Sequence, residues 1–105
     1  MNRLLLAATT AFALCAGTAA LAKDHEVQIV DLKYKPAKLK VKKGDKVIWK
    51  NADDRDHTAI AKDDSFKSNK IAAGKKYEFK FEKVGKFEYG CKYHPRLRGV
   101  VEVVE

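Results

Sequence analysis

The chain of 105 residues contains little cysteine, methionine or proline: two Cys, one Met and two Pro. Two cysteines cannot hold together a disulfide-rich scaffold. A chain of this length has room for one domain at most, which excludes a nucleotide-binding fold with a separate substrate domain. Aromatic residues make up 10% of the chain, which is ordinary for a packed core and too high for a disordered tail.

Residues 1–22 have the pattern of a secretory signal peptide. A short positive start that includes Arg3 precedes a largely apolar run over 4–19, and 20–22 form an A-x-A cleavage motif. An uncleaved anchor is the alternative, because the apolar run is nearly long enough to span a bilayer. We therefore expect export to the periplasm and a monomeric mature chain, 23–105, with no membrane span.

Removal of this leader would leave Cys91 as the single cysteine and would leave no methionine. The formal charge would change only from +8 to +7, because Arg3 is removed with the leader. A lone thiol in an exported protein cannot form an internal disulfide. Its presence needs another explanation, such as intermolecular pairing, reactivity or metal ligation.

Alternation of apolar and charged residues dominates the mature chain, and helical periodicity is hard to find. Runs with period two occur over 77–81 and 87–91, and turn residues such as Gly44 and Gly85 separate them from their neighbours. This pattern predicts a single all-β domain, a β-sandwich. The polar stretch 51–68 is interpreted as a long connection around a short strand.

Three residues with metal-binding side chains occur at suggestive positions. Cys91 and His94 form a C-x2-H pair at the end of an aromatic strand, and Pro95 stiffens the exit from this loop. His57 lies far upstream at the start of a strand, and in a sandwich distant strands can meet at one end. Two imidazoles and one thiolate form the ligand set of a type 1 (blue) copper electron-transfer site.

The segment 89–101 resembles the copper-ligand loop of the cupredoxins, the blue copper proteins that include amicyanin, plastocyanin and pseudoazurin. The segment 51–58 is similar to the part of these proteins that carries their first histidine, and the resemblance covers 26–104. The fold that it implies is an all-β Greek-key β-sandwich of about seven to eight strands. It implies that one copper ion, cycling between Cu(I) and Cu(II), is held by three equatorial ligands: His57, Cys91 and His94.

The resemblance fails at two positions. The family usually has methionine where this chain has Leu97, which cannot coordinate a metal, so the resemblance implies a three-coordinate copper. Loss of the weak axial donor should favour Cu(I) and raise the reduction potential. Thr58 stands where the family often has asparagine, and we expect its hydroxyl to hold the Cys91 loop by a hydrogen bond.

Each ligand has a simpler interpretation when taken alone. His57 would be a loop histidine, Cys91 an inert buried thiol and His94 a polar turn residue, and Leu97 would be an ordinary core residue. A structural zinc site would require a fourth ligand. Three nearby acidic residues resemble half of a calcium loop, but the glycine and terminal glutamate of that pattern are absent. We predict that they form a solvated loop: Asp53, Asp54 and Asp56.

A second copper site is predicted at the mature N-terminus. If Lys23 is the first residue, its amine, the amides of Asp24 and His25, and the imidazole of His25 could surround Cu(II) in a plane. Square-planar nitrogen sites suit Cu(II) and Ni(II). The alternative is a chance histidine on a frayed terminus.

We expect a one-electron carrier that is not an enzyme. A periplasmic carrier or buffer of Cu(I) is the first alternative, and a metal-free adhesion or interaction domain is the second. The expected partner is an acidic redox protein, such as a c-type cytochrome or a periplasmic dehydrogenase, and not nucleic acid. Its predicted docking patch surrounds His94: Lys92, Tyr93, Pro95, Arg96 and Arg98.

Overall fold

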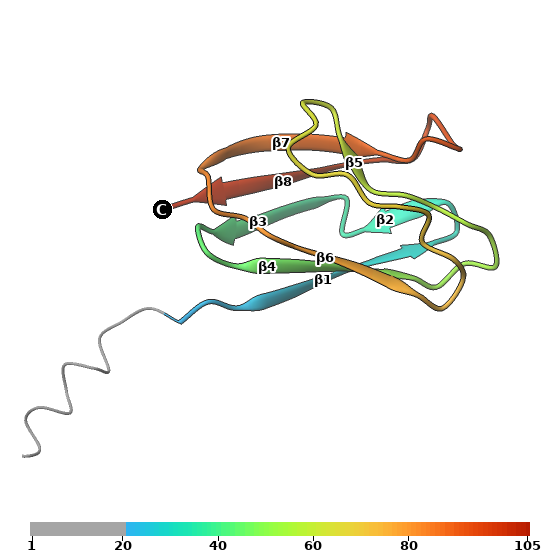
Figure 1. Ribbon diagram of the computed structural model, residues 1–105, viewed down its shortest axis with the longest axis horizontal. Coiled ribbons are helices and arrows are strands. Elements are labelled where there is room, and N and C mark those ends of the chain that lie inside the picture. Colours follow the sequence, from blue (N-terminus) through green and yellow to red (C-terminus); the bar gives the residue numbers. More distant parts are fainter. Residues whose placement is uncertain (1–20) are drawn as a thin grey trace, which may run out of the picture.

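The computed structural model describes residues 21–105, and nearly all of the predicted leader lies outside these residues. The strands are β1 Asp24–Val30, β2 Lys33–Lys35, β3 Lys38–Lys42, β4 Lys46–Asn51, β5 Ile60–Ala61, β6 Lys76–Lys80, β7 Gly85–Gly90 and β8 Arg98–Val104 (Figure 1). No helix occurs over 21–105, and therefore none there is long and apolar enough to cross a membrane.

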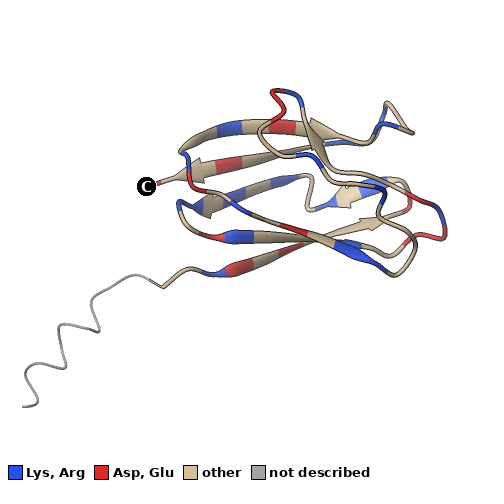
Figure 2. Ribbon diagram, viewed as in Figure 1, with Lys and Arg blue, Asp and Glu red and all other residues tan. Residues whose placement is uncertain are grey.

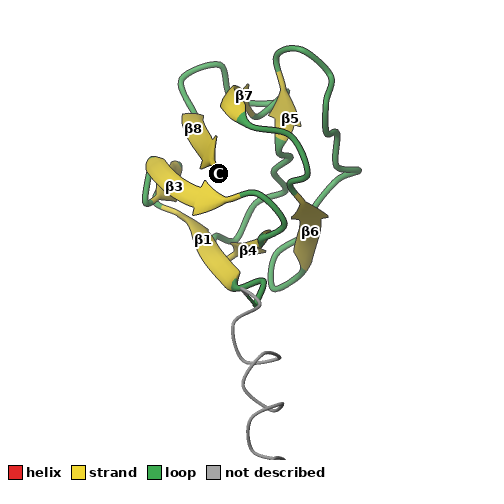
Figure 3. Cartoon of the chain, turned by 90° about the vertical axis from the view of Figure 1, so that its left-hand side faces the viewer, coloured by secondary structure: helices red, strands yellow, loops and turns green. Residues whose placement is uncertain are grey.

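Two four-stranded sheets make up the domain, with strand orders β2-β1-β4-β6 and β3-β8-β7-β5. The sheets face each other across the core (Figure 3). Each sheet contains one parallel pair, β1 with β4 and β3 with β8, and its other pairs are antiparallel. The predicted all-β Greek-key sandwich with about seven to eight strands is confirmed.

The inward faces of the strands follow the predicted alternation. In β1, Val27 and Ile29 are fully buried, whereas Glu26 before them and Gln28 between them are exposed to solvent. In β7, Phe87 and Tyr89 are buried on the same principle. A period of two therefore places one apolar face of each strand against the opposite sheet.

The first strand is shorter than expected from the sequence. The expected strand-like run includes Leu32 with Val27 and Ile29, but Leu32 is out of phase with their alternation and lies in the β1–β2 turn with 42% of its surface exposed. Asp31 and Leu32 both have positive φ, at 55° and 57°, a region that non-glycine residues rarely occupy. Their amide N–H groups donate to the two carboxylate oxygens of Asp53, which stabilises the turn.

An aromatic cluster fills the core beneath one end of the sandwich. Trp49 is fully buried, and its ring centroid lies 5.2 Å from Phe66 and 5.3 Å from Tyr89. Tyr34 packs against Tyr89 at 4.5 Å and donates a hydrogen bond of 2.6 Å to the carbonyl oxygen of Thr58. Burial raises the pKa of Tyr34 far above its ordinary value, so this hydroxyl remains a donor. The cluster thus joins two segments that carry predicted ligands.

Gly99 in β8 leaves the space that the ring of Tyr89 occupies. The two residues are register partners, and a Cβ on Gly99 would lie 2.5 Å from Cζ and Oη of Tyr89. We expect Gly99→Ala to lower the free energy of unfolding by about 1–3 kcal/mol, because the ring must move out of a close-packed core. Urea unfolding measures this loss.

Tyr89→Leu supplies the control for this prediction. If the clash is the cause, the double variant loses less stability than the sum of the single losses. Additive losses would contradict the proposed contact between Gly99 and Tyr89.

Candidate metal centre

Three elements bring the predicted ligands to the same end of the sandwich. His57 follows β4 and forms a two-way backbone bridge with Ile71, with N···O distances of 3.1 and 2.7 Å. Cys91 comes directly after β7, and His94 lies in the loop between β7 and β8. Since β7 is antiparallel to β8 and pairs with β5, its end lies beside the segment that starts at His57.

The side chains of these three residues point at one another. Sγ of Cys91 lies 3.8 Å from Nδ1 of His57 and 3.8 Å from Nδ1 of His94. All three donor atoms lie within 4.8 Å of one another. His57 is fully buried, Cys91 is nearly so, and His94 is half-buried. The prediction from sequence thus names three residues that the structure brings together.

This geometry fits a trigonal metal ion. Bonds of about 2.0–2.1 Å to imidazole nitrogen and about 2.3 Å to thiolate sulfur, at an angle of about 120°, separate the two donors by about 3.7–3.8 Å. The observed distances from Cys91 to the two histidines have this value. A soft thiolate with two imidazoles is a donor set that copper accepts.

Asp53 holds the ring of His57 from the other side. Oδ2 of Asp53 lies 2.8 Å from Nε2 of His57, so the Nε2–H donates to the carboxylate and leaves Nδ1 facing Cys91. Partial burial alone would raise the pKa of this carboxyl, but the hydrogen bonds from His57, Asp31 and Leu32 outweigh it and lower the pKa. Such an outer partner orients a metal-binding histidine and makes it more basic.

The predicted solvated acidic loop is therefore wrong for Asp53. Its side chain is 13% exposed and accepts three hydrogen bonds, whereas Asp54 and Asp56 lie at the surface. Asn51 closes the same loop, because its Oδ1 accepts from the amide of Asp53 and its Nδ2 donates to the carbonyl of Ile71. The four-residue spacing from Asp53 to His57 was the available signal in the sequence.

The loop that carries Cys91 and His94 is held at both ends. The amide of Lys92 donates to Oγ1 of Thr58 at 2.9 Å, which confirms the expected role of this hydroxyl. The amide of Cys91 donates to the carbonyl of Leu97, and the amide of Leu97 donates to the carbonyl of His94. Leu97 is 2% exposed and presents only carbon to the core.

The predicted docking patch lies on the surface of this end. All five of its residues are exposed, and Tyr93 has 44% of its surface free. Nζ of Lys92 lies 5.6 Å from the ring centroid of Tyr93, and Nε of Arg98 donates to the carbonyl of Pro95. The patch therefore combines an aromatic surface with a basic rim.

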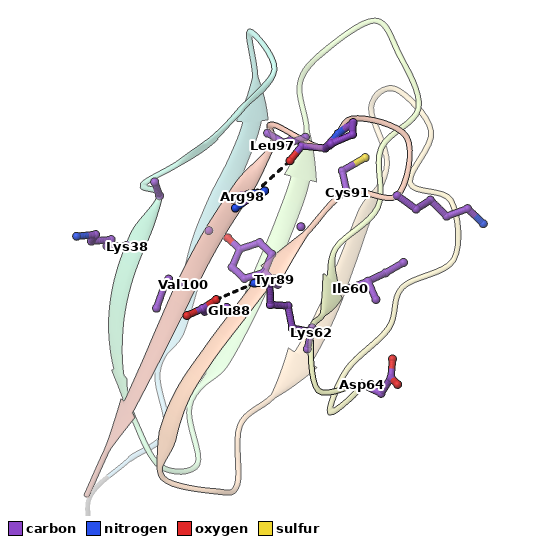
Figure 4. Close-up of a pocket in the computed structure, with 16 residues that line it drawn as sticks. Lys38, Ile60, Lys62, Asp64, Glu88, Tyr89, Cys91, Leu97, Arg98 and Val100 are labelled. Atoms are coloured by element: carbon purple, nitrogen blue, oxygen red, sulfur yellow. Dashed lines mark hydrogen bonds and ion pairs between the residues drawn. The ribbon is translucent and has the colours of Figure 1, made fainter.

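A groove of about 560 Å³ lies beside Cys91 on the sheet of β3, β8, β7 and β5 (Figure 4). Leu97 and Val100 contribute apolar surface to it, and Lys38 and Arg98 line it with positive charge. Lys62 crosses it to form an ion pair of 3.2 Å with Glu88. The groove connects the ligand loop with the flank of the sandwich.

The predicted second copper site, Lys23 to His25, lies at the start of β1, away from His57, Cys91 and His94. It remains a prediction. Its atoms already have partners in the structure, because the Lys23 amide and Nε2 of His25 each lie 2.9 Å from a carboxylate oxygen of Asp45. Asp24 pairs with Lys46 at the start of the parallel ladder. Cu(II) binding there would have to break this arrangement.

Comparison with known proteins identifies the family. A family model described as a cupredoxin-like domain matches residues 3–103. The chain belongs to the cupredoxin-like family. Its cofactor is one copper ion, as the donor set of His57, Cys91 and His94 also indicates.

Individual cupredoxins show the extent of the likeness. Amicyanin from Paracoccus versutus is 29% identical over 82 residues, which are 73% of this chain and 62% of that protein, so the match spans less than two thirds of amicyanin. A purple cupredoxin from Nitrosopumilus maritimus is 28% identical with a TM-score of 0.72, over 76% of this chain and 99% of that one. An oxidised methionine-to-leucine mutant of amicyanin is 31% identical with a TM-score of 0.71, over 75% and 80%.

Asp45 gives the far end of this cupredoxin a pH-dependent stability. Hydrogen bonds from the amide of Lys23, from His25 and from the amide of Lys42 lower the pKa of Asp45 to about 2. Because this pKa is below the unfolded value of about 3.9, the ionised carboxylate stabilises the fold above pH 4. That stability is lost as the pH falls toward 2.

Asp45→Asn should lower the free energy of unfolding at neutral pH by about 1–2 kcal/mol, after allowance for solvent screening. The difference from the wild type should vanish near pH 2. Asp24→Asn, at an exposed position in β1, should keep the wild-type profile. A deficit that stays constant from pH 6 to pH 2 would contradict this role of Asp45.

Proposed function

We propose that this cupredoxin is a periplasmic type 1 copper protein that carries single electrons between redox partners. One observation supports the proposal above all others: three donor atoms of His57, Cys91 and His94 converge within 4.8 Å. We assign these residues as the equatorial copper ligands. When bound, copper supplies a Cu(I)/Cu(II) couple that needs no bond-making in a substrate.

The surrounding residues keep the three ligands in one geometry. Asp53 fixes the ring of His57, and Thr58 fixes the loop that carries Cys91. Cys91 loses its thiol proton when a metal binds, because the thiolate is the ligand. Rigid ligands favour electron exchange since little has to move between the two oxidation states. His94 is half-buried and leads from the ligand set to the surface.

Leu97 decides the character of the proposed site. It stands at the axial position of the resemblance, is buried, and offers no donor atom. We infer a three-coordinate copper with a preference for Cu(I) and a raised reduction potential. The fold shared with a methionine-to-leucine mutant of amicyanin supports the view that this scaffold accepts leucine in place of a methionine.

The proposed partner is an acidic redox protein, such as a c-type cytochrome or a periplasmic dehydrogenase. It would approach His94 across Tyr93 and Pro95, and the basic rim of Lys92, Arg96 and Arg98 would guide it. Charges at such a rim affect the rate of encounter more than the affinity.

A Cu(I) carrier is the second candidate, and Leu97 favours it because loss of the axial donor stabilises Cu(I). The two functions differ in what leaves the protein. A shuttle exchanges electrons quickly and retains its metal, whereas a carrier passes Cu(I) to an acceptor protein. Mixing the Cu(I)-loaded protein with a metal-free Cu(I)-binding acceptor protein, followed by separation and copper analysis of each, distinguishes them: rapid transfer supports the carrier, and retention of the metal supports the shuttle.

Cys91→Ser tests the proposed ligand set. The mature protein with one equivalent of Cu(II) should show an intense blue thiolate-to-copper absorption band, and Cys91→Ser should show none because it lacks the sulfur donor. His25→Ala, remote from the site, should keep the band.

The same titration separates the alternatives. A colourless wild type that binds one Cu(I) through Cys91 would favour the carrier. A wild type that binds neither ion would favour the metal-free interaction domain.

Leu97→Met tests the axial position. A thioether placed there should donate weakly to copper, stabilise Cu(II) and lower the reduction potential, as measured by redox titration of the blue band. Leu97→Ile, which changes shape without adding a donor, is the control. Equal potentials for the methionine and isoleucine variants would show that residue 97 does not face the metal.

A further inference from the structure

Residues 33–43 carry an unusual concentration of one charge. Six of these eleven residues are lysine, and none is aspartate or glutamate. All six lysines are exposed. We call them the lysine strip: Lys33, Lys35, Lys38, Lys40, Lys42 and Lys43.

The lysine strip lies along one side of the whole sandwich. β2 is an edge strand of one sheet, β3 is an edge strand of the other, and the two follow each other in the chain. In Figure 2 the blue of lysine and arginine colours parts of the ribbon in both strands. Lys38 also lines the groove beside Cys91 together with Arg98. The strip therefore continues into the basic rim at the copper end.

Most lysines on the other strands have an acidic partner, whereas only one of the six lysines of the strip has one among residues 21–105. Lys46 and Lys76 share Glu78, and Lys80 pairs with Glu82. Within the strip, the one ion pair found among residues 21–105 joins Lys35 to Asp31 at 4.0 Å, with both side chains exposed.

Two acidic residues lie next to β3. Asp45 accepts a hydrogen bond of 3.0 Å from the amide of Lys42, at the end of β3 that is remote from Cys91. Glu102 on β8 is the register partner of Lys40, whereas Val100 and Val104 stand opposite Lys38 and Lys42. Alternate residues of a strand lie about 6.6–6.8 Å apart. This spacing is below the Debye length of about 8 Å at physiological salt, so the fields of the three β3 lysines add.

Protection of sheet edges explains part of this pattern but not its single sign. Charged residues on edge strands prevent edge-to-edge association. The other two edges achieve this without a positive row, because β6 alternates Lys76, Glu78 and Lys80, and β5 is only two residues long. Mixed charge or a short strand is sufficient there, so the excess on β2 and β3 calls for another explanation.

A protein surface fits the strip better than a lipid surface. Elements that lie on membranes combine basic residues with an adjoining apolar face. Among residues 21–105, the large exposed apolar side chains are Leu21, Leu32, Val84 and Tyr93, and none lies within 33–43. A purely charged strip fits carboxylate groups on a folded protein, which complementary charge attracts over a distance.

We propose that the lysine strip is a docking surface for an acidic redox protein, which it guides and orients so that its redox centre comes to rest near His94. This inference rests on the proposed electron-transfer function. The strip extends the contact beyond the rim of Lys92, Arg96 and Arg98 along the flank of the sandwich. It acts on encounter and orientation, not on the ligand set.

Two triple variants with equal charge test the proposal. The first carries Lys38→Gln, Lys40→Gln and Lys42→Gln in the strip, and the control carries the same change at three exposed lysines elsewhere: Lys76, Lys80 and Lys83. Stopped-flow mixing of each copper-loaded protein with an acidic bacterial c-type cytochrome measures the second-order rate of electron exchange. Basic mitochondrial cytochrome c is the opposite probe.

At low ionic strength we expect the strip variant to exchange electrons with the acidic cytochrome roughly tenfold more slowly than the wild type. The control variant should fall by much less, and added salt should remove the difference. With the basic cytochrome the strip variant should be no slower than the wild type.

Equal slowing of both variants would overturn the proposal, because net charge alone would then explain the rate. Unchanged rates combined with loss of binding to phosphatidylglycerol vesicles would also overturn it and would make the partner a membrane. The blue band and reduction potential of each variant keep the two proposals apart. If the wild type shows no band and no exchange, the electron-transfer function itself fails.

Discussion

The position of Tyr34 between two distant segments is the constraint on which the metal centre depends. Its ring packs against Tyr89, two residues before Cys91, and its hydroxyl donates to the carbonyl of Thr58, next to His57. The two proposed ligands, His57 and Cys91, are 34 residues apart in the chain, yet their donor atoms lie 3.8 Å apart. A close-packed interior transmits small displacements, so the core holds this distance more firmly than the loops alone could.

Asp53 connects the candidate metal centre to the first sheet. Asp53 stabilises the β1–β2 turn through two backbone amides and holds His57 through its side chain. A partly buried carboxylate with fewer partners would be costly, and three hydrogen bonds offset that cost. The same residue therefore joins a strained turn to a proposed copper ligand, and the first sheet becomes part of the metal centre.

Charge is arranged in two ways over the surface. Lysines on β4 and β6, and Lys62 next to β5, pair with glutamates, so that much of their charge is balanced locally. Lysines on β2 and β3 form a row of one sign that reaches the groove beside Cys91. Ion-paired lysines produce little long-range electrostatic field, whereas the row of lysines on β2 and β3 produces one. The paired lysines therefore serve solvation, and the row can serve recognition of a partner.

Much of this cupredoxin was determined by sequence alone. Alternation with period two predicted the strands, and the two-residue separation of Cys91 from His94 predicted that both lie in one short loop. Both features are local, because they depend only on residues that are close together in the chain. The tertiary structure decided what depends on distant contacts: the parallel pairing of β1 with β4, the exposure of Leu32 in a turn that Asp53 holds, and the approach of Cys91 to His57. No local pattern encodes these, since each arises only when segments far apart in the chain are packed together.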